Sequence, residues 1–121
     1  MKPTCLCLLL ATAITCFAAD GNKPRVLVLS GANNHDWKTT TPAIKAALEE
    51  TGRFLVDVEE KATDMKPESF APYEVILSNF NTFGKDAPLK KEWEPATRKA
   101  FLDHIAKGRG LVIVHAGSSV F

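Results

Sequence analysis

Two short segments combine side chains that could perform acid–base chemistry on a small polar ligand. The first is Asn33-Asn34-His35-Asp36-Trp37, which brings two amides, an imidazole, a carboxylate and an indole together. The second is His115-Ala116-Gly117, which directly follows an apolar run. An imidazole can take up or release a proton near neutral pH. His35 and His115 are therefore the candidate catalytic residues, and Asp36 could orient an imidazole or accept a proton.

The polar residues near these histidines suit a polyhydroxylated ligand such as a sugar. Amide side chains donate and accept hydrogen bonds, and an indole offers an apolar platform for a sugar ring. The candidate substrate-binding residues are Asn33, Asn34, Trp37, Asn79 and Asn81. In the structural alternative, Asn33 and Asp36 form turns, Asp36 acts as a local cap, and Trp37 packs beneath a helix. His115 would then be a core histidine whose ring is satisfied by backbone carbonyls.

The sequence has few features of a metal or nucleotide site. No two histidines have the i, i+4 spacing of a helical metal site. We predict no metal, and a metal held across loops by the two candidate histidines and Asp36 is the alternative. The glycine-rich dinucleotide fingerprint and the phosphate loop are both missing, since Gly31 alone follows the first apolar run. A nucleotide cofactor is therefore disfavoured, and the sequence leaves any other cofactor unknown.

Short apolar runs predict the strands that would position these residues. Uninterrupted apolar runs at 26–29 and 111–114 are typical of strands buried on both faces of a sheet. Residues 73–78 form a third candidate strand. Apolar and polar residues alternate over 54–59, which predicts a strand nearer an edge with one wetter face.

Two helices are predicted between these strands. Thr41 is the expected N-cap of the first, with Pro42 at its first position and Gly52 at its end. The second is expected to run from Pro95 to Gly108. Its inward-facing residues should be Phe101, Leu102 and Ile105. His104 stands among charged residues on this helix and is predicted to be exposed and inert.

The alternation of strands and helices predicts an open, mostly parallel α/β sheet with helices on both faces, as in flavodoxin-like folds. Ligands of such sheets bind beyond the carboxyl ends of the strands. With a strand order of 2-1-3-4, the segments after the first, third and fourth strands would share one rim. The sequence ends where a helix should follow the fourth strand, so we expect the N-terminal part of a longer domain, truncated after that strand.

The first residues have the pattern of a cleavable secretory signal peptide. Lys2 precedes an apolar run over 5–14, and small residues follow up to Ala19. The run is too short for an ordinary membrane-spanning helix, and an uncleaved anchor is the alternative. We expect a signal peptide at residues 1–19 and an exported domain, periplasmic or extracellular, at residues 20–121. All three cysteines lie in the leader, so core packing must hold the exported domain together without disulfides.

Composition excludes several classes of partner. The chain is 45% hydrophobic and 24% charged with a formal net charge of +1, which is typical of an ordinary globular domain. Neither sign of charge forms a long block, so no nucleic-acid partner is expected. We expect no membrane partner after signal cleavage. A small-molecule carbohydrate is the expected partner, and self-association or a partner domain stays open.

Four segments of the chain together resemble the ThuA-like, or trehalose-utilisation, family. They are Arg25 to Trp37, Thr39 to Pro42, Glu50 to Phe54, and Gly110 to Gly117. The resemblance implies a class I glutamine amidotransferase-like fold with His115 at the elbow where amidotransferases hold a nucleophilic cysteine. Without that thiol, glutamine hydrolysis through a thioester is not available.

The resemblance further implies a role in carbohydrate metabolism. The expected substrates are disaccharides or their keto derivatives, processed by acid–base chemistry of a lyase, isomerase or hydrolase type. Family members are commonly longer than this chain. The competing hypotheses are a non-catalytic carbohydrate-binding or interaction module, and an inactive fragment of a longer enzyme.

Overall fold

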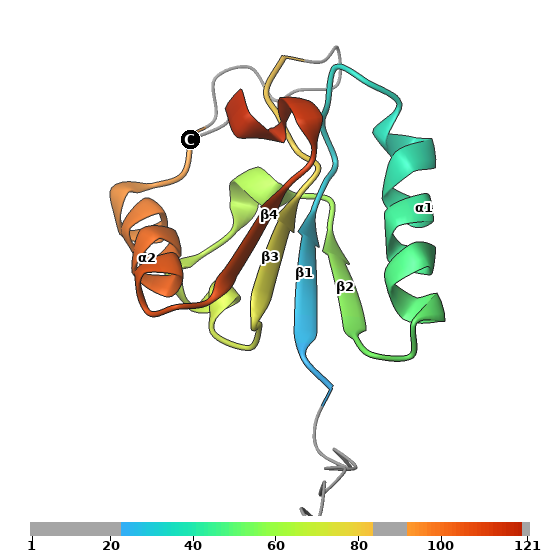
Figure 1. The fold of residues 1–121 in the computed structure, drawn as a ribbon. Coiled ribbons are helices and arrows are strands. Elements are labelled where there is room, and N and C mark those ends of the chain that lie inside the picture. The colour runs from blue at the N-terminus through green and yellow to red at the C-terminus, as the bar shows by residue number, and fades with distance from the viewer. Residues whose placement is uncertain (1–22, 84–91, 120–121) are drawn as a thin grey trace, which may run out of the picture.

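A computed structural model describes residues 23–83 and 92–119 (Figure 1). The predicted signal peptide and part of the loop after the third strand lie outside these residues. The strands are β1 (Arg25–Leu29), β2 (Leu55–Glu59), β3 (Val75–Ser78) and β4 (Gly110–Ile113). They form one parallel sheet in the order β2-β1-β3-β4, which confirms the predicted α/β fold and strand order.

The two helices, α1 (Trp37–Glu50) and α2 (Pro95–Ala106), lie on opposite faces of the sheet (Figure 1). Successive residues of β1 point to opposite faces and so enter two separate cores. Val26 and Val28 pack with Ile44 and Leu48 of α1. On the other face, a second core forms around Phe101 of α2 and includes Leu27, Leu29, Ile76 and Phe80. Neither helix is long and apolar enough to cross a membrane.

Helix α1 begins earlier than the sequence predicts. Its N-cap is Asp36, whose Oδ1 accepts a hydrogen bond from the backbone N–H of Thr39 at 3.2 Å. The prediction of Thr41 as the cap was wrong because Thr41 is buried, with its hydroxyl 2.6 Å from that of Ser30. Pro42 lies within the helix, where its missing N–H leaves out one helical hydrogen bond.

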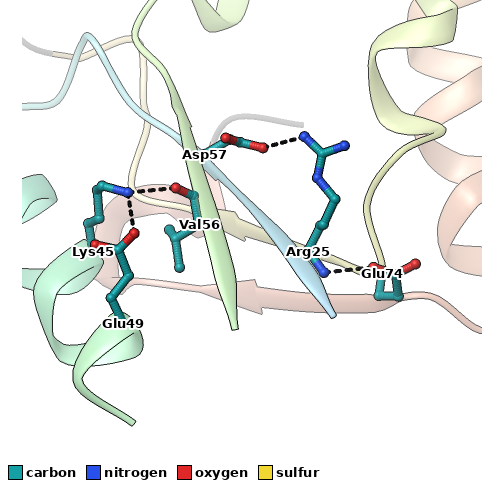
Figure 2. A network of polar contacts seen from close by, with 6 residues as sticks. All are labelled: Arg25, Lys45, Glu49, Val56, Asp57 and Glu74. Carbon is teal, nitrogen blue, oxygen red and sulfur yellow. Dashed lines mark hydrogen bonds and ion pairs between the residues drawn. The ribbon is translucent and has the colours of Figure 1, made fainter. Parts of the chain in front are cut away.

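The two edges of the sheet differ. Leu55 and Glu59 form hydrogen bonds with the β1 side, so the carbonyl of Val56 faces outward, where the Lys45 ammonium donates to it at 2.6 Å (Figure 2). Lys45 also pairs with Glu49 on α1. A positive charge on the outer carbonyl blocks further strand pairing at the β2 edge.

At the other edge, β4 is more exposed than the apolar run predicts. Val112 is 48% exposed and Ile113 is 43% exposed, because no described strand lies beyond β4. Leu102 was also expected to face inward but is 56% exposed. Phe101 and Ile105 supply the contacts of α2 with the core instead.

Charged residues fix the amino ends of the strands, opposite the candidate site. The Arg25 guanidinium donates to Asp57 at 2.6 Å, and the Arg25 backbone N–H donates to Glu74 at 2.7 Å (Figure 2). The hydrogen bond from Arg25 lowers the pKa of Asp57. These contacts join β1 to β2 and to the start of β3, so this end of the sheet has a structural role.

The prediction that His104 is exposed was wrong. Its side chain is 8% exposed and faces the ring of Phe70 at a centroid distance of 6.3 Å. Thr97, Phe101 and His104 follow one another at helical spacing and form the buried stripe of α2. The Nε2 atom of His104 is buried and has no hydrogen-bond partner in the described part of the chain.

This burial predicts a pH-dependent stability. Desolvation lowers the pKa of His104 from 6.5, because burial disfavours the charged imidazolium. The unfolded chain therefore binds a proton more readily than the folded one, and the stabilisation from neutral His104 is lost as the pH falls below 6.5. Urea unfolding between about pH 7.5 and about pH 5 should show this loss. His104→Gln should flatten the dependence, and an unchanged slope in that variant would contradict it.

Candidate functional site

The segments that follow β1, β3 and β4 meet at one rim of the sheet (Figure 1). This is the rim at the carboxyl ends of the strands, where the sequence places the candidate residues. The segments are connected by side-chain contacts between residues distant in sequence. Asn33 and Asn81 are hydrogen-bonded to each other, and the rings of His35 and His115 are in contact.

The two candidate catalytic histidines form a pair. The ring centroids of His35 and His115 lie 4.7 Å apart, with the ring planes tilted by 51°. Both residues are exposed. The described part of the chain gives neither imidazole a hydrogen-bond partner. Their nitrogens are therefore free to meet a ligand from solvent.

A sharp turn after β4 carries His115. His115 has a φ of 45°, and within the described residues it is the non-glycine residue with positive φ. It opens a short 3₁₀ turn, η3 (His115–Ser119), directly after β4. A Cβ at Gly117 would lie 2.6 Å from the carbonyl oxygen of Ser78, so the turn packs tightly on the end of β3. Strain of this kind is concentrated at functional sites, where the surrounding structure holds it in place.

Three of the five candidate sugar-binding residues lie beneath the rim. Asn33, Asn79 and Asn81 are buried. The Asn33 amide donates to the carbonyl of Asn79 at 3.0 Å, and the Asn81 amide donates to Asn33 Oδ1 at 3.1 Å and to Asn34 Oδ1 at 2.7 Å. In return, Asn33 Oδ1 accepts from the backbone N–H of His35 at 2.9 Å. These amides hold the loop that carries His35.

Loss of Asn81 should destabilise this support. Asn81→Ala would leave the backbone N–H groups of Asn34 and Phe83 without the Oδ1 that both now use. The buried Asn81 side chain also donates to Asn33 and Asn34, and each hydrogen bond of this kind contributes about 0.5–1.5 kcal/mol, so we expect a loss of about 2–4 kcal/mol in the free energy of unfolding. Urea denaturation measures it. Asn34→Ala, at an exposed position, is the control and should cost less than half as much; equal losses would contradict the network.

Asp36 is tied to α1 rather than to an imidazole. Hydrogen bonds from Thr39, chiefly from its side chain and then from its backbone, lower the pKa of Asp36. The carboxylate caps the helix and is exposed. No hydrogen bond joins it to either histidine among the described residues.

Trp37 stands at the first turn of α1 and is partly buried. Its indole Nε1 is buried and has no hydrogen-bond partner within the described ranges. The Lys38 ammonium lies 5.6 Å from the centre of the ring. Trp37 and the exposed Asn34 are the two candidate binding residues that reach the surface of the rim.

Three hydroxyl residues lie in or beside this support, Thr40 and Thr41 in α1 and Ser78 at the end of β3, and sequence reasoning missed this role. Asn79 Nδ2 donates to the hydroxyls of Thr40 at 3.1 Å and Thr41 at 3.0 Å. The Ser78 hydroxyl is buried beneath the turn at Gly117, without a hydrogen-bond partner in the described part. Their positions in the sequence could have indicated this role, because Ser78 ends an apolar strand and Thr40 and Thr41 lie near the start of the neighbouring helix.

The described residues hold no cluster of three or more His, Cys, Asp or Glu side chains that could bind a metal ion. Asp36 therefore does not join the histidine pair as a third ligand. The chemistry that the arrangement offers directly is proton transfer by two exposed imidazoles over a rigid amide platform.

The fold and the rim define a parallel α/β domain with a histidine pair at the carboxyl ends of its strands. The chain belongs to the trehalose-utilisation (ThuA) family, whose model matches residues 25–121. This confirms the resemblance found in the sequence. No match was found among curated proteins.

A solved structure extends this result. The ThuA-like protein from Parabacteroides merdae ATCC 43184 is 31% identical, with a TM-score of 0.64. The match covers 83% of this chain and 35% of that one. The chain therefore spans about a third of the length of that relative.

Proposed function

We propose that this protein is an exported member of the ThuA family that processes disaccharides or keto-sugar derivatives by acid–base chemistry. The observation that carries the proposal is the contact of His35 with His115 at 4.7 Å, on a rim where both imidazoles are open to solvent. One neutral imidazole removes a proton while the other, protonated, donates one to a developing oxyanion. A C–H next to a keto group is acidic enough for such a base.

The surrounding residues take two different roles in this proposal. Asn34 and Trp37 reach the surface and would contact hydroxyl groups and a sugar face. Asn33, Asn79 and Asn81 position the His35 loop from below. Asp36 fixes the start of α1 and thereby the loop that precedes it.

Glutamine amidotransfer is not part of the proposal. The turn after β4 carries His115, and the described residues contain no cysteine. An imidazole at this position cannot form the thioester on which that reaction depends.

Export is proposed from the leader sequence alone, with its Lys2, its apolar run over 5–14 and its small residues before Ala19. The proposed partner is a small carbohydrate.

The test is a thermal melt of the purified protein with millimolar trehalose, other disaccharides and keto-disaccharides. A ligand that binds the folded state raises the melting temperature by mass action. We expect a keto-disaccharide to raise it, and Trp37→Ala to remove the shift. A shift without turnover would favour a carbohydrate-binding module. No shift with any sugar would refute the proposal for this chain.

A further inference from the structure

We propose that His35 and His115 form a two-imidazole chelate for a divalent transition ion of the zinc class. A bound ion would inhibit acid–base catalysis by both rings, and this consequence rests on the proposed function. The binding itself does not depend on that function.

The distance between the rings fits a shared ion. A zinc–imidazole bond is about 2.0–2.1 Å, and the ring centre lies about 1.1 Å behind the nitrogen, so the centroid sits about 3.2 Å from the ion. Two rings bound at about 90–110° around one ion therefore have centroids about 4.5–5.2 Å apart. The observed separation of 4.7 Å falls within that range.

The rings are also accessible to an ion. Both side chains are exposed and tilted by 51°, so they are not stacked flat on each other. No hydrogen bond within the described residues occupies their nitrogens. Zinc-class ions prefer imidazole nitrogen, whereas calcium and magnesium prefer oxygen ligands.

The backbones that carry the two rings are held in place. The Asn33 side chain accepts from the His35 backbone N–H, and the Asn81 amide fixes Asn33 in turn. His115 is held at positive φ by a turn that packs on β3 through Gly117. A chelate therefore needs little rearrangement of the backbone, and this lowers the entropic cost of binding.

The coordination would remain open. No third His, Cys, Asp or Glu completes a cluster in the described ranges. Zinc is usually four-coordinate, so an ion on this pair keeps positions for water or for substrate oxygens. An open two-ligand site implies weaker binding than that of a structural zinc site.

Isothermal titration calorimetry of the purified protein with zinc chloride tests the site. At about pH 7.5 we expect one ion to bind per chain. His35→Ala and His115→Ala should each weaken binding roughly tenfold or more. His104→Gln is the matched control, since His104 is buried on α2, and it should bind as the wild type does. Magnesium chloride should give no binding.

Binding that survives either alanine substitution, or an absence of zinc binding in the wild-type protein, would overturn the chelate. Circular dichroism of each variant checks that the fold is retained. Turnover of a keto-disaccharide in metal-free buffer separates this inference from the proposed function. Zinc binding without turnover would refute the function alone, and turnover without zinc binding would refute the chelate alone. If both hold, zinc should inhibit turnover in proportion to occupancy.

Discussion

Replacing His115 with glycine is expected to abolish turnover of a keto-disaccharide and yet give a more stable domain than replacement with alanine. The loss of a general acid or base costs about 10²–10⁴-fold in rate, and both substitutions remove the imidazole. They differ in backbone strain, because His115 has a φ of 45°. Glycine adopts this conformation freely, whereas alanine retains a penalty of about 1 kcal/mol.

The two measurements for this pair of variants are independent. Steady-state turnover reports the role of the side chain, and urea denaturation reports the backbone strain. Turnover near the wild-type level in either variant would remove His115 from the chemistry. Equal stability of the two variants would show that the positive φ at the turn carries no strain.

Replacing Gly31 with alanine is expected to have the largest effect on stability. Gly31 has a φ of 92°, and a Cβ there would lie 1.6 Å from the carbonyl oxygen of Glu60. Neither group can yield without moving backbone, because Gly31 lies just beyond the end of β1 and Glu60 directly follows β2. We expect a loss of about 3–5 kcal/mol in the free energy of unfolding, which is more than most single substitutions cost.

Gly52 provides the matched control for this prediction. It also has a positive φ, 65°, but a Cβ there would meet nothing within 4 Å. Gly52→Ala therefore isolates the backbone penalty, which we expect to be about 1 kcal/mol. Urea denaturation of both variants separates steric overlap from strain. Similar losses in the two variants would contradict the close approach at Gly31.

The sheet was predictable because its signals are local. Uninterrupted apolar runs mark β1 and β4, and alternation marks the edge strand β2. Helix α1 was harder, since Thr41-Pro42 and Asp36 both have the chemistry of a helix start. The choice depends on a tertiary contact, the burial of Thr41 against Ser30, which no local pattern contains.

Burial on α2 could have been read from spacing. Flanking charges suggested that His104 is exposed, but it continues the stripe of Thr97 and Phe101 at helical spacing. Leu102 is adjacent to Phe101 and so lies on a different face, which accounts for its exposure.

The candidate site was predictable as a set of residues but not as an arrangement. The strand-end rule brings the His35 loop and His115 to one rim. The sequence could not show which amides reach the surface of the rim and which are buried beneath it. An asparagine among polar neighbours gives the same sequence pattern in both positions. The positive φ of His115 depends equally on tertiary packing, here of the η3 turn on the end of β3.

Proton exchange in heavy water is the most direct test of acid–base chemistry at this rim. The purified protein is incubated with a keto-disaccharide in D₂O, and ¹H NMR follows the loss of the signal from the C–H next to the keto group. We predict exchange with the wild-type protein and with His104→Gln, and its loss in both His35→Ala and His115→Ala. Undiminished exchange in the two alanine variants, or none with the wild-type protein, would contradict a catalytic histidine pair.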